Sequence, residues 1–446
     1  MKARFGTDGL RGRAGDLITP ELAQRLGRSA ARILGAPAGR IVLGRDTRWS
    51  GTMLAAAFAS GAAAEGIDVV DLGVVPTPVV ASMAAGGGCP GAVVSASHNP
   101  YPDNGIKLFA AGGTKLRDDQ EAAIEADMAS GEATYLYGDR LGRVGADPDA
   151  LARYLNKLID ALEGRSLSGI KVVLDTANGA AVATAREAFE RAGADVADIV
   201  GALPDGTNIN SGCGSSDPSA LATCVLRAGA NLGLAFDGDA DRVVAVDDAG
   251  RVVDGDRLLA LFATDLMATG HLQGSGIAVT VMSNLGLHKA MADAGIEVVT
   301  TKVGDRNILE ALESRGWSLG GEQSGHIVFP GLATTGDGVL TGLLLADLVV
   351  RSGRPLAELG ESCMRSYPQV ALNVPVARRD ELDAAAAIWD EVALVEENLG
   401  DSGRVVLRAS GTEQLVRVMV EAADEAEASA AAERLAGAVS RVLSDR

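Results

Sequence analysis

Residues 41–64 read IVLGRDTRWSGTMLAAAFASGAAA, and residues 65–73 continue as EGIDVVDLG. An apolar run rich in Val and Ile is followed by a polar turn, an Ala-rich stretch long enough for a helix, and a second apolar run. Gly66 stands where the helix should end, because glycine readily adopts the left-handed conformation that terminates helices. The segment therefore predicts a strand, a helix and a second strand parallel to the first.

The same order of patterns occurs twice more. KVVLDTANGAAVATAREAFERAG at 171–193 is followed by DVADIVG, and IAVTVMSNLGLHKAMADAG at 277–295 is followed by IEVVTTKVG. Each unit leads to a short polar motif: SASHNP at 95–100, DGDADR at 237–242 and GEQSGH at 321–326. Apolar strands of this kind are buried under helices on both faces of a sheet, so we expect three related mixed α/β/α domains. Because ligands gather at the carboxyl ends of such strands, the three motifs should face one central cleft.

The last part of the chain has a different pattern. From about Tyr367 it predicts a strand, a helix from Glu381 to Leu399, two strands joined by a short polar loop, and a helix from Glu425 to Leu443. Two adjacent strands joined in this way pair antiparallel, so we expect a smaller C-terminal α+β domain. We place the four domains at residues 1–150, 151–252, 253–366 and 367–446.

Composition restricts the class of protein. Hydrophobic residues make up 47% of the 446 residues and charged residues 22%, which is typical of a globular protein. The formal net charge of -19 disfavours binding to nucleic acid. The four cysteines lack metal-site spacing, no signal peptide is recognisable, and the most apolar stretch, Leu340 to Val350, is too short to cross a membrane. We expect a cytoplasmic protein without a membrane partner; the oligomeric state stays open, a homodimer included.

The motif DGDADR predicts a metal site. Asp237, Asp239 and Asp241 occupy alternate positions after the apolar strand LGLAF. Carboxylates this close repel one another unless a cation lies among them, and oxygen ligands favour Mg²⁺. An EF-hand calcium loop does not fit, because Arg242 stands at the position where that loop requires glycine. A solvated acidic turn is the alternative interpretation.

The motif SASHNP places Ser97 and His98 just after the apolar strand GAVV. Adjacent residues of an extended chain point in opposite directions, and no GxSxG motif occurs, so the pair does not indicate a serine hydrolase. Ser97 is instead a candidate carrier of a phosphate held by the metal. A structural turn closed by Asn99 and Pro100 is the alternative.

Two further motifs suit a phosphorylated sugar. GEQSGH offers Glu322, Ser324 and an imidazole between glycines, which fits sugar hydroxyls but fits a polar turn equally well. RASGTE begins at Arg408, and Arg417 follows on the next strand. Backbone amides of such a turn and guanidinium groups predict a phosphate clamp. A hairpin turn with arginines facing solvent is the alternative.

In this order, FGTDGLRG at 5–12, SASHNP, DGDADR, GEQSGH and RASGTE resemble the motifs of the α-D-phosphohexomutase superfamily, and the resemblance covers the whole chain. Ala240 and Gln414 depart from its usual glycine and proline without removing a ligand. The resemblance implies four domains around a cleft and an isomerase that moves phosphate through a phosphoserine. GTDGLRG, GEQSGH and SGTE are most similar to the branch acting on glucosamine phosphates. A glucose or mannose phosphate mutase, a sugar phosphatase and a non-catalytic binding protein are the alternatives.

The resemblance also implies the roles of individual residues, with a phosphorylated hexosamine as substrate, Mg²⁺ as cofactor and a sugar bisphosphate as activator. It assigns catalysis to Ser97, His98, Lys107 and Arg242. It assigns the metal to Ser97, Asp237, Asp239 and Asp241. It assigns substrate binding to Thr7, Arg11, Glu322, Ser324, Arg408, Ser410, Gly411, Thr412 and Arg417.

Overall fold

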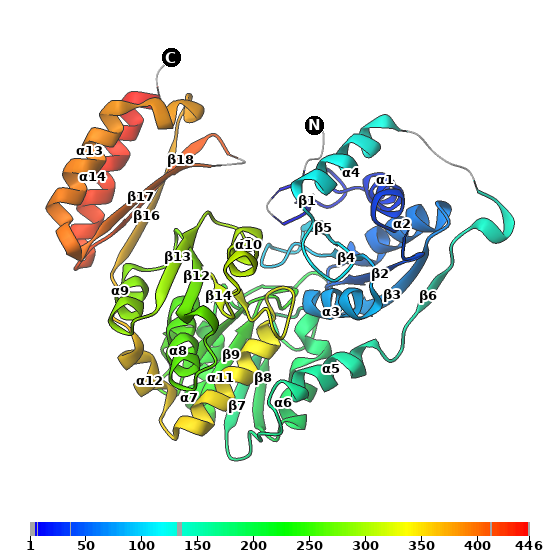
Figure 1. Ribbon diagram of the computed structural model, residues 1–446, viewed down its shortest axis with the longest axis horizontal. Coiled ribbons are helices and arrows are strands. Elements are labelled where there is room, and N and C mark those ends of the chain that lie inside the picture. Colours follow the sequence, from blue (N-terminus) through cyan, green and yellow to red (C-terminus); the bar gives the residue numbers. More distant parts are fainter. Residues whose placement is uncertain (1–4, 7, 36, 132–135, 411–412, 445–446) are drawn as a thin grey trace.

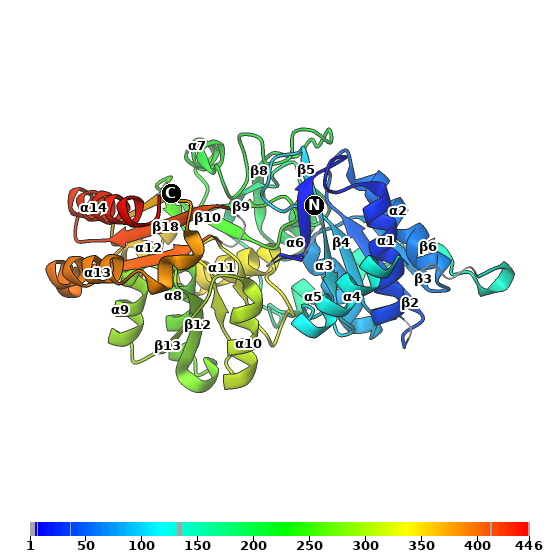
Figure 2. The same ribbon diagram turned by 90° about the horizontal axis from the view of Figure 1, so that it is seen from above.

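The computed structural model describes residues 5–6, 8–35, 37–131, 136–410 and 413–444. Strands of this part of the chain form four sheets, which follow one another along the chain (Figure 1). The first three sheets are covered by helices and the fourth belongs to a small C-terminal domain, so the predicted fold class is confirmed. Seen from above, the C-terminal domain and the first domain lie at opposite ends of the molecule (Figure 2).

The first sheet has the strand order β1-β5-β4-β2-β3-β6. Its strands are β1 (Leu10–Arg13), β2 (Arg40–Arg45), β3 (Asp68–Val74), β4 (Gly91–Val94), β5 (Asp103–Phe109) and β6 (Val144–Ala146). Its helices are α1 (Pro20–Ala30), α2 (Gly51–Ala64), α3 (Thr77–Gly87) and α4 (Asp118–Ser130).

The second sheet has the order β11-β10-β9-β7-β8 and the third β13-β12-β14-β15. The second comprises β7 (Lys171–Asp175), β8 (Asp195–Val200), β9 (Leu232–Phe236), β10 (Val243–Asp247) and β11 (Val252–Val253), with helices α5 (Ala150–Asp160), α6 (Ala185–Arg191) and α7 (Ser219–Ala228). The third comprises β12 (Gly276–Thr280), β13 (Glu297–Thr301), β14 (Gly320–Gly321) and β15 (Ile327–Val328), with helices α8 (Gly255–Ala268), α9 (Leu285–Asp293), α10 (Asp305–Arg315), α11 (Gly338–Ser352) and α12 (Leu356–Cys363).

The three domains repeat one topology. In each, the first strand of the predicted unit pairs parallel with the strand after the helix on one side, and with the strand before the polar motif on the other. The glycines expected to end the helices, Gly66, Gly193 and Gly295, have φ of 81°, 94° and 69°, in the left-handed region. A fourth strand also pairs antiparallel with each motif strand. The three polar motifs therefore occupy the same turn in each domain, at the carboxyl end of the sheet.

The largest apolar cluster joins the first three domains. It contains Val79 of α3, Phe189 of α6 and Leu343 of α11, all with no exposed surface. Helix α11 follows the third sheet in the chain but contacts strands β9 and β10 of the second. Gly342 permits this contact, because a Cβ there would lie 2.9 Å from the Leu234 side chain. A shared core of this kind fixes the relative positions of the three motif turns.

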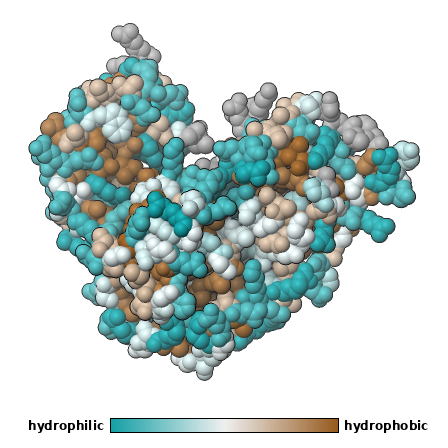
Figure 3. Space-filling view, viewed as in Figure 1, coloured by the Kyte–Doolittle hydropathy of each residue, from teal (hydrophilic) through white to brown (hydrophobic). Residues whose placement is uncertain are grey.

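The C-terminal domain is an antiparallel sheet of β16 (Gln369–Pro375), β18 (Leu415–Glu421) and β17 (Arg404–Ala409), packed against α13 (Ala386–Leu399) and α14 (Glu425–Leu443). The predicted helix start at Glu381 is wrong: a 3-10 turn covers Arg379–Ala384, and α13 begins after it. The Trp389 indole donates a hydrogen bond to the carbonyl of Leu382 at 3.0 Å and holds this turn on the helix. Figure 3 shows an open cleft between this domain and the first domain. No helix within the described ranges has the length and apolar character needed to span a membrane.

Candidate active site

The serine motif and the aspartate motif meet at the junction of the first and second domains. Asp237, Asp239 and Asp241 lie on the turn between β9 and β10, and all three are buried. One carboxylate oxygen from each lies within 4.8 Å of the other two. The Ser97 hydroxyl, on the turn after β4, donates a hydrogen bond to Asp237 Oδ2. The structure therefore brings together the four residues predicted to hold a metal.

The charges of these aspartates are only partly compensated. Lys107 Nζ donates to Asp239 Oδ2 at 2.7 Å and to Asp241 Oδ2 at 3.0 Å, whereas Oδ1 of both residues is buried without a hydrogen-bond partner among the described residues. Burial and the neighbouring carboxylates of Asp241 and Asp239 raise the pKa of Asp237 well above its usual value. Buried oxygens that lack donors are costly. A hard divalent cation such as Mg²⁺ fits this donor set.

The backbone around Ser97 is held in an unusual conformation. Ser97 has φ of 52°, in the left-handed region, and its amide donates to Ser95 Oγ at 2.9 Å. Its carbonyl accepts hydrogen bonds from the buried Arg48 guanidinium and from Asn210 Nδ2, each at 2.9 Å. At Gly238 a Cβ would lie 2.5 Å from the same carbonyl, so this position requires glycine. Side chains from two domains thus fix the serine turn, and the sequence patterns gave no sign of Arg48 or Asn210.

His98 lies beside Ser97, and the expectation that the two side chains point apart is wrong. His98 Nδ1 is 3.4 Å from Ser97 Oγ and 3.2 Å from Arg242 Nη1. The reason is the left-handed backbone of Ser97, since the prediction assumed an extended chain. Partial desolvation and the guanidinium groups of Arg242 and Arg11 lower the pKa of His98 to about 4. A neutral imidazole therefore lies beside the serine hydroxyl, and the two guanidinium groups that act on this imidazole bring positive charge to this side of the site.

Lys107, on β5, is buried with 1% of its side chain exposed and contacts three carboxylates, those of Asp239, Asp241 and Asp8. Burial alone would lower its pKa, but these carboxylates hold the pKa well above its usual value. Asp8 belongs to FGTDGLRG and also pairs with Arg11. Sequence reasoning missed Asp8, although a carboxylate three residues from a candidate arginine was a usable signal. Thr7 lies outside the described residues.

The GEQSGH turn approaches the aspartates from the third domain. The buried His326 ring places Nδ1 3.8 Å from Asp241 Oδ1. Burial alone would lower the pKa of His326, but the interaction with the nearby Asp241 carboxylate outweighs burial and raises the pKa. Glu322 Oε1 accepts a hydrogen bond from the Gly304 amide at 3.2 Å, and the exposed Ser324 hydroxyl lies 3.4 Å from Glu322 Oε2. The predicted sugar contacts thus stand beside a histidine that touches the metal site.

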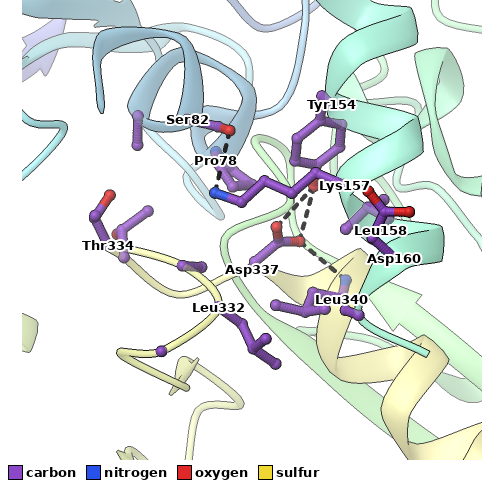
Figure 4. Close-up of a pocket in the computed structure, with 15 residues that line it drawn as sticks. Pro78, Ser82, Tyr154, Lys157, Leu158, Asp160, Leu332, Thr334, Asp337 and Leu340 are labelled. Carbon is purple, nitrogen blue, oxygen red and sulfur yellow. Dashed lines mark hydrogen bonds between the residues drawn. The ribbon is translucent and has the colours of Figure 1, made fainter. Parts of the chain in front are cut away.

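A cavity of about 200 Å³ lies behind this histidine, between α3, α5 and the loop before α11 (Figure 4). Asp337 accepts hydrogen bonds from the Tyr154 hydroxyl at 2.8 and 2.9 Å and from the Leu340 amide at 3.0 Å. Burial raises the pKa of Asp337 to about 6. The neighbouring Gly336 amide donates to His326 Nε2 at 3.1 Å. None of the predicted site residues lines this cavity, so we do not count it as part of the site. We interpret its surroundings as the packing behind His326.

The RASGTE loop stands apart from the other motifs, across the open side of the cleft (Figures 1 and 3). Arg408 and Arg417 are direct neighbours across the antiparallel pair β17–β18. Arg408 has no hydrogen-bond or ion-pair partner in the described part of the chain, and burial and Arg417 lower its pKa. Arg417 Nη2 reaches Glu413 Oε2 at 3.2 Å, and Ser410 Oγ accepts from the Glu413 amide at 3.2 Å. Gly411 and Thr412 lie outside the described residues.

This arrangement of domains corresponds to that of a known protein family. Models of the phosphoglucomutase/phosphomannomutase family match the whole length in order: α/β/α domain I at residues 2–135, domain II at 152–250, domain III at 254–367 and the C-terminal domain at 372–438. The chain belongs to the phosphoglucomutase/phosphomannomutase family. The four matched segments correspond in order to the four sheets of the structure.

Members of the family with known names or structures show how far the similarity extends. A phosphoglucosamine mutase of Rhodococcus opacus is 52% identical, covering 99% of this chain and 100% of that protein. The crystal structure of a phosphoglucomutase/phosphomannomutase family protein from Burkholderia thailandensis is 25% identical, with a TM-score of 0.83 over 99% of this chain and 98% of that one. An Aspergillus fumigatus N-acetylphosphoglucosamine mutase, solved in complex with GlcNAc-6P and magnesium, shares the fold at 19% identity, with a TM-score of 0.71 over 99% of this chain and 96% of that one.

Proposed function

We propose that this phosphohexomutase interconverts glucosamine 6-phosphate and glucosamine 1-phosphate. The observation that supports this most is the hydrogen bond from the Ser97 hydroxyl to Asp237, in a buried aspartate cluster with two oxygens that have no hydrogen-bond partner among the described residues. The identity of 52% to a phosphoglucosamine mutase over the full length supports the amino sugar as substrate. The product would serve cytoplasmic synthesis of cell-wall precursors.

Asp237, Asp239 and Asp241 would hold Mg²⁺ together with a phosphate oxygen on Ser97. The ion, when bound, supplies positive charge that neutralises the phosphoryl oxygens during transfer. Arg242 and Arg11 supply positive charge from the protein, because both act on His98 beside the serine hydroxyl. Such fixed positive charge is the main protein contribution to phosphoryl transfer.

In the first transfer the bond between phosphorus and Ser97 Oγ breaks, a bond from phosphorus to the free sugar hydroxyl oxygen forms, and Ser97 Oγ takes up a proton to become a hydroxyl again. The proton of that hydroxyl passes to a nearby base. His98 and Lys107 are the two candidates. His98 is neutral at pH 7 because its pKa is lowered to about 4, whereas the raised pKa of Lys107 keeps it protonated, so His98 is the one able to accept the proton. The product of this step is a sugar bisphosphate, whose other phosphate returns to Ser97 in the reverse chemistry. A sugar bisphosphate added from solution would prime Ser97 in the same way.

The C-terminal domain would hold the phosphate that is not reacting. Arg408 and Arg417 stand side by side, and only Arg417 pairs with a carboxylate in the described part of the chain, that of Glu413. Two adjacent guanidinium groups suit a dianion. Ser410, Gly411 and Thr412 would complete this clamp. Glu322 and Ser324 would contact the sugar hydroxyls between the two phosphates. Each end of the bisphosphate would occupy the clamp in turn. The open cleft would close over the sugar during transfer and so exclude water from the phosphoserine.

A mutase assay tests this proposal. The protein is given Mg²⁺, a trace of glucose 1,6-bisphosphate, and in separate reactions the 6-phosphates of glucosamine, glucose and mannose. We expect conversion to the 1-phosphate to be fastest for glucosamine, without release of inorganic phosphate. Faster conversion of glucose or mannose phosphate would move the protein to another branch of the family, and stoichiometric inorganic phosphate would indicate a phosphatase.

A further inference from the structure

Lys115 forms an ion-pair bridge between the first and third domains behind the proposed site. The residue lies on the turn after β5, with 10% of its side chain exposed. Its Nζ pairs with Asp8 Oδ1 in the first domain and, at 2.9 Å, with Asp305 Oδ2 in the third. The turn itself is held in place, because the Thr334 hydroxyl of the third domain donates to the carbonyl of Gly113 at 2.7 Å. Neither the sequence motifs nor the proposed mechanism uses Lys115.

One end of this bridge leads to the phosphoryl-transfer residues. Asp8 Oδ2 lies 2.9 Å from Lys107 Nζ and also contacts Arg11. Burial alone would raise the pKa of Asp8, but Lys107, Lys115 and Arg11 hold it well below its usual value. Asp8 is thus an anion shared by three cations, and its position sets where Lys107 and Arg11 stand. Removing one cation lets the carboxylate turn toward the other two.

The other end of the bridge leads to Glu322 and His326 of the third domain, which form the proposed sugar-binding wall. Asp305 is the first residue of α10, and the amide of the preceding Gly304 donates to Glu322 Oε1 at 3.2 Å. Asp305 Oδ2 also lies 3.7 Å from His326 Nε2. A side chain that holds Asp305 therefore holds the wall on which Glu322 and His326 stand.

We propose that Lys115 is a positioning residue that couples the sugar-binding wall to the phosphoryl-transfer residues. It is not among the residues proposed to contact the sugar or the phosphate. By pairing with Asp8 and Asp305 together it sets the distance between Lys107 and Glu322, which come from different domains and must act on one sugar. This inference rests on the proposed function, because it concerns the geometry of that transfer. Small errors of alignment are costly in such a reaction.

Arg306 provides a control for the general loss of contacts between the first and third domains. Arg306, next to Asp305, pairs with Asp118 and Glu121 of α4 and so bridges the same domains. Its partners do not contact Asp8, Lys107 or Glu322 in the described part of the chain. Replacing Arg306 removes contacts between the domains and leaves the ion pairs of Lys115 in place.

The experiment compares Lys115→Met, Lys115→Arg, Asp305→Asn and Arg306→Met with the wild type, using glucosamine 6-phosphate, Mg²⁺ and sugar bisphosphate. We expect Lys115→Met to lower kcat on the order of tenfold to a hundredfold and to leave KM within about threefold. A larger share of turnovers should release inorganic phosphate, because a misplaced acceptor leaves the phosphoserine to water. Lys115→Arg should recover most of kcat, Asp305→Asn should resemble Lys115→Met, and Arg306→Met should stay within about twofold of the wild type.

Equal kcat in Lys115→Met and the wild type would overturn the inference. A loss of kcat in Arg306→Met as large as that in Lys115→Met would also overturn it, because Lys115 would then only hold the two domains together. If Lys115→Met does not fold, as judged by its thermal unfolding midpoint, Asp305→Asn decides by the same criteria. A wild type that converts none of the three hexose 6-phosphates would refute the proposed function, and this result is read before any variant.

Discussion

The aspartate turn between β9 and β10 in the second domain and the β17–β18 hairpin of the C-terminal domain differ in how their charges are compensated. Around Asp239 and Asp241 each carboxylate is buried and one oxygen of each is paired with Lys107. On the hairpin, Arg408 and Arg417 face each other across two strands, and like charges in direct opposition destabilise a strand pair. In the first region opposite charges are paired, whereas in the second two like charges are neighbours and an anion would stabilise them.

This difference indicates a division of labour. Phosphoryl transfer needs charges fixed in place, which the shared core of three domains provides. The proposed clamp would have to take either phosphate of a bisphosphate that turns over, and it stands on a separate domain with its own core. The predictions below test the two regions separately, beginning with the largest expected effect.

Ser97→Ala should abolish turnover, by about a thousandfold or more, because the phosphate carrier is lost. The fold should persist, since the turn is held through backbone groups of Ser97. The mutase assay and the thermal unfolding midpoint measure the two effects. An active Ser97→Ala variant would refute the proposed role of Ser97 as the carrier of the phosphate.

Removal of divalent metal should abolish activity, and Mg²⁺ should restore it. At a hundred times its Kd, Mg²⁺ should raise the free energy of unfolding by about 2.7 kcal/mol. In Asp237→Asn this gain should shrink, while the metal-free variant should be more stable than the metal-free wild type because carboxylate repulsion is relieved. Thermal unfolding with and without Mg²⁺ checks both effects. If metal-free Asp237→Asn were less stable, the repulsion inferred among the aspartates would be wrong.

Arg408→Gln should raise KM roughly tenfold to a hundredfold with a smaller effect on kcat, because it removes a charged hydrogen bond to the distant phosphate. The same change should stabilise the ligand-free protein by roughly 0.5 kcal/mol, since Arg417 loses a like-charged neighbour. Arg434→Gln, which removes an exposed pair with Glu391 in the same domain, is the control. Steady-state kinetics and chemical unfolding measure both effects. An unchanged KM would remove Arg408 from the clamp.

Asp337→Asn should change how stability depends on pH. The folded state raises the pKa of Asp337 to about 6, so it favours the protonated acid. The stabilisation is complete below about pH 4 and is lost as pH rises to about 6, by roughly 1–3 kcal/mol in all. The difference in unfolding free energy between the wild type and the variant, followed from pH 4 to 7, should show this slope. A constant difference would contradict the burial argument.

Sequence patterns predicted the repeat, the fold class and the turns that carry the motifs, because strand, helix and glycine signals are local. They did not predict the antiparallel fourth strand of the third domain, since β15 has two residues and shows no periodicity. The orientation of His98 was wrong because the positive φ of Ser97 depends on Arg48 and Asn210 from distant segments.

The charges around the site illustrate the same limit. Asp8 and Asp305 are nearly three hundred positions apart in the chain, and Lys115 joins them once the first and third domains pack together. The roles of the predicted site residues stay predictions, although the structure places the serine, the aspartates and Lys107 in contact.

A single-turnover experiment with labelled phosphate tests the central claim most directly. The protein is phosphorylated at Ser97 with labelled sugar bisphosphate, freed of excess reagent, and mixed with unlabelled glucosamine 6-phosphate and Mg²⁺. Transfer through the phosphoserine predicts that the label leaves Ser97 and appears in glucosamine bisphosphate and glucosamine 1-phosphate. Label that stays on the protein, or that appears as inorganic phosphate, would contradict it.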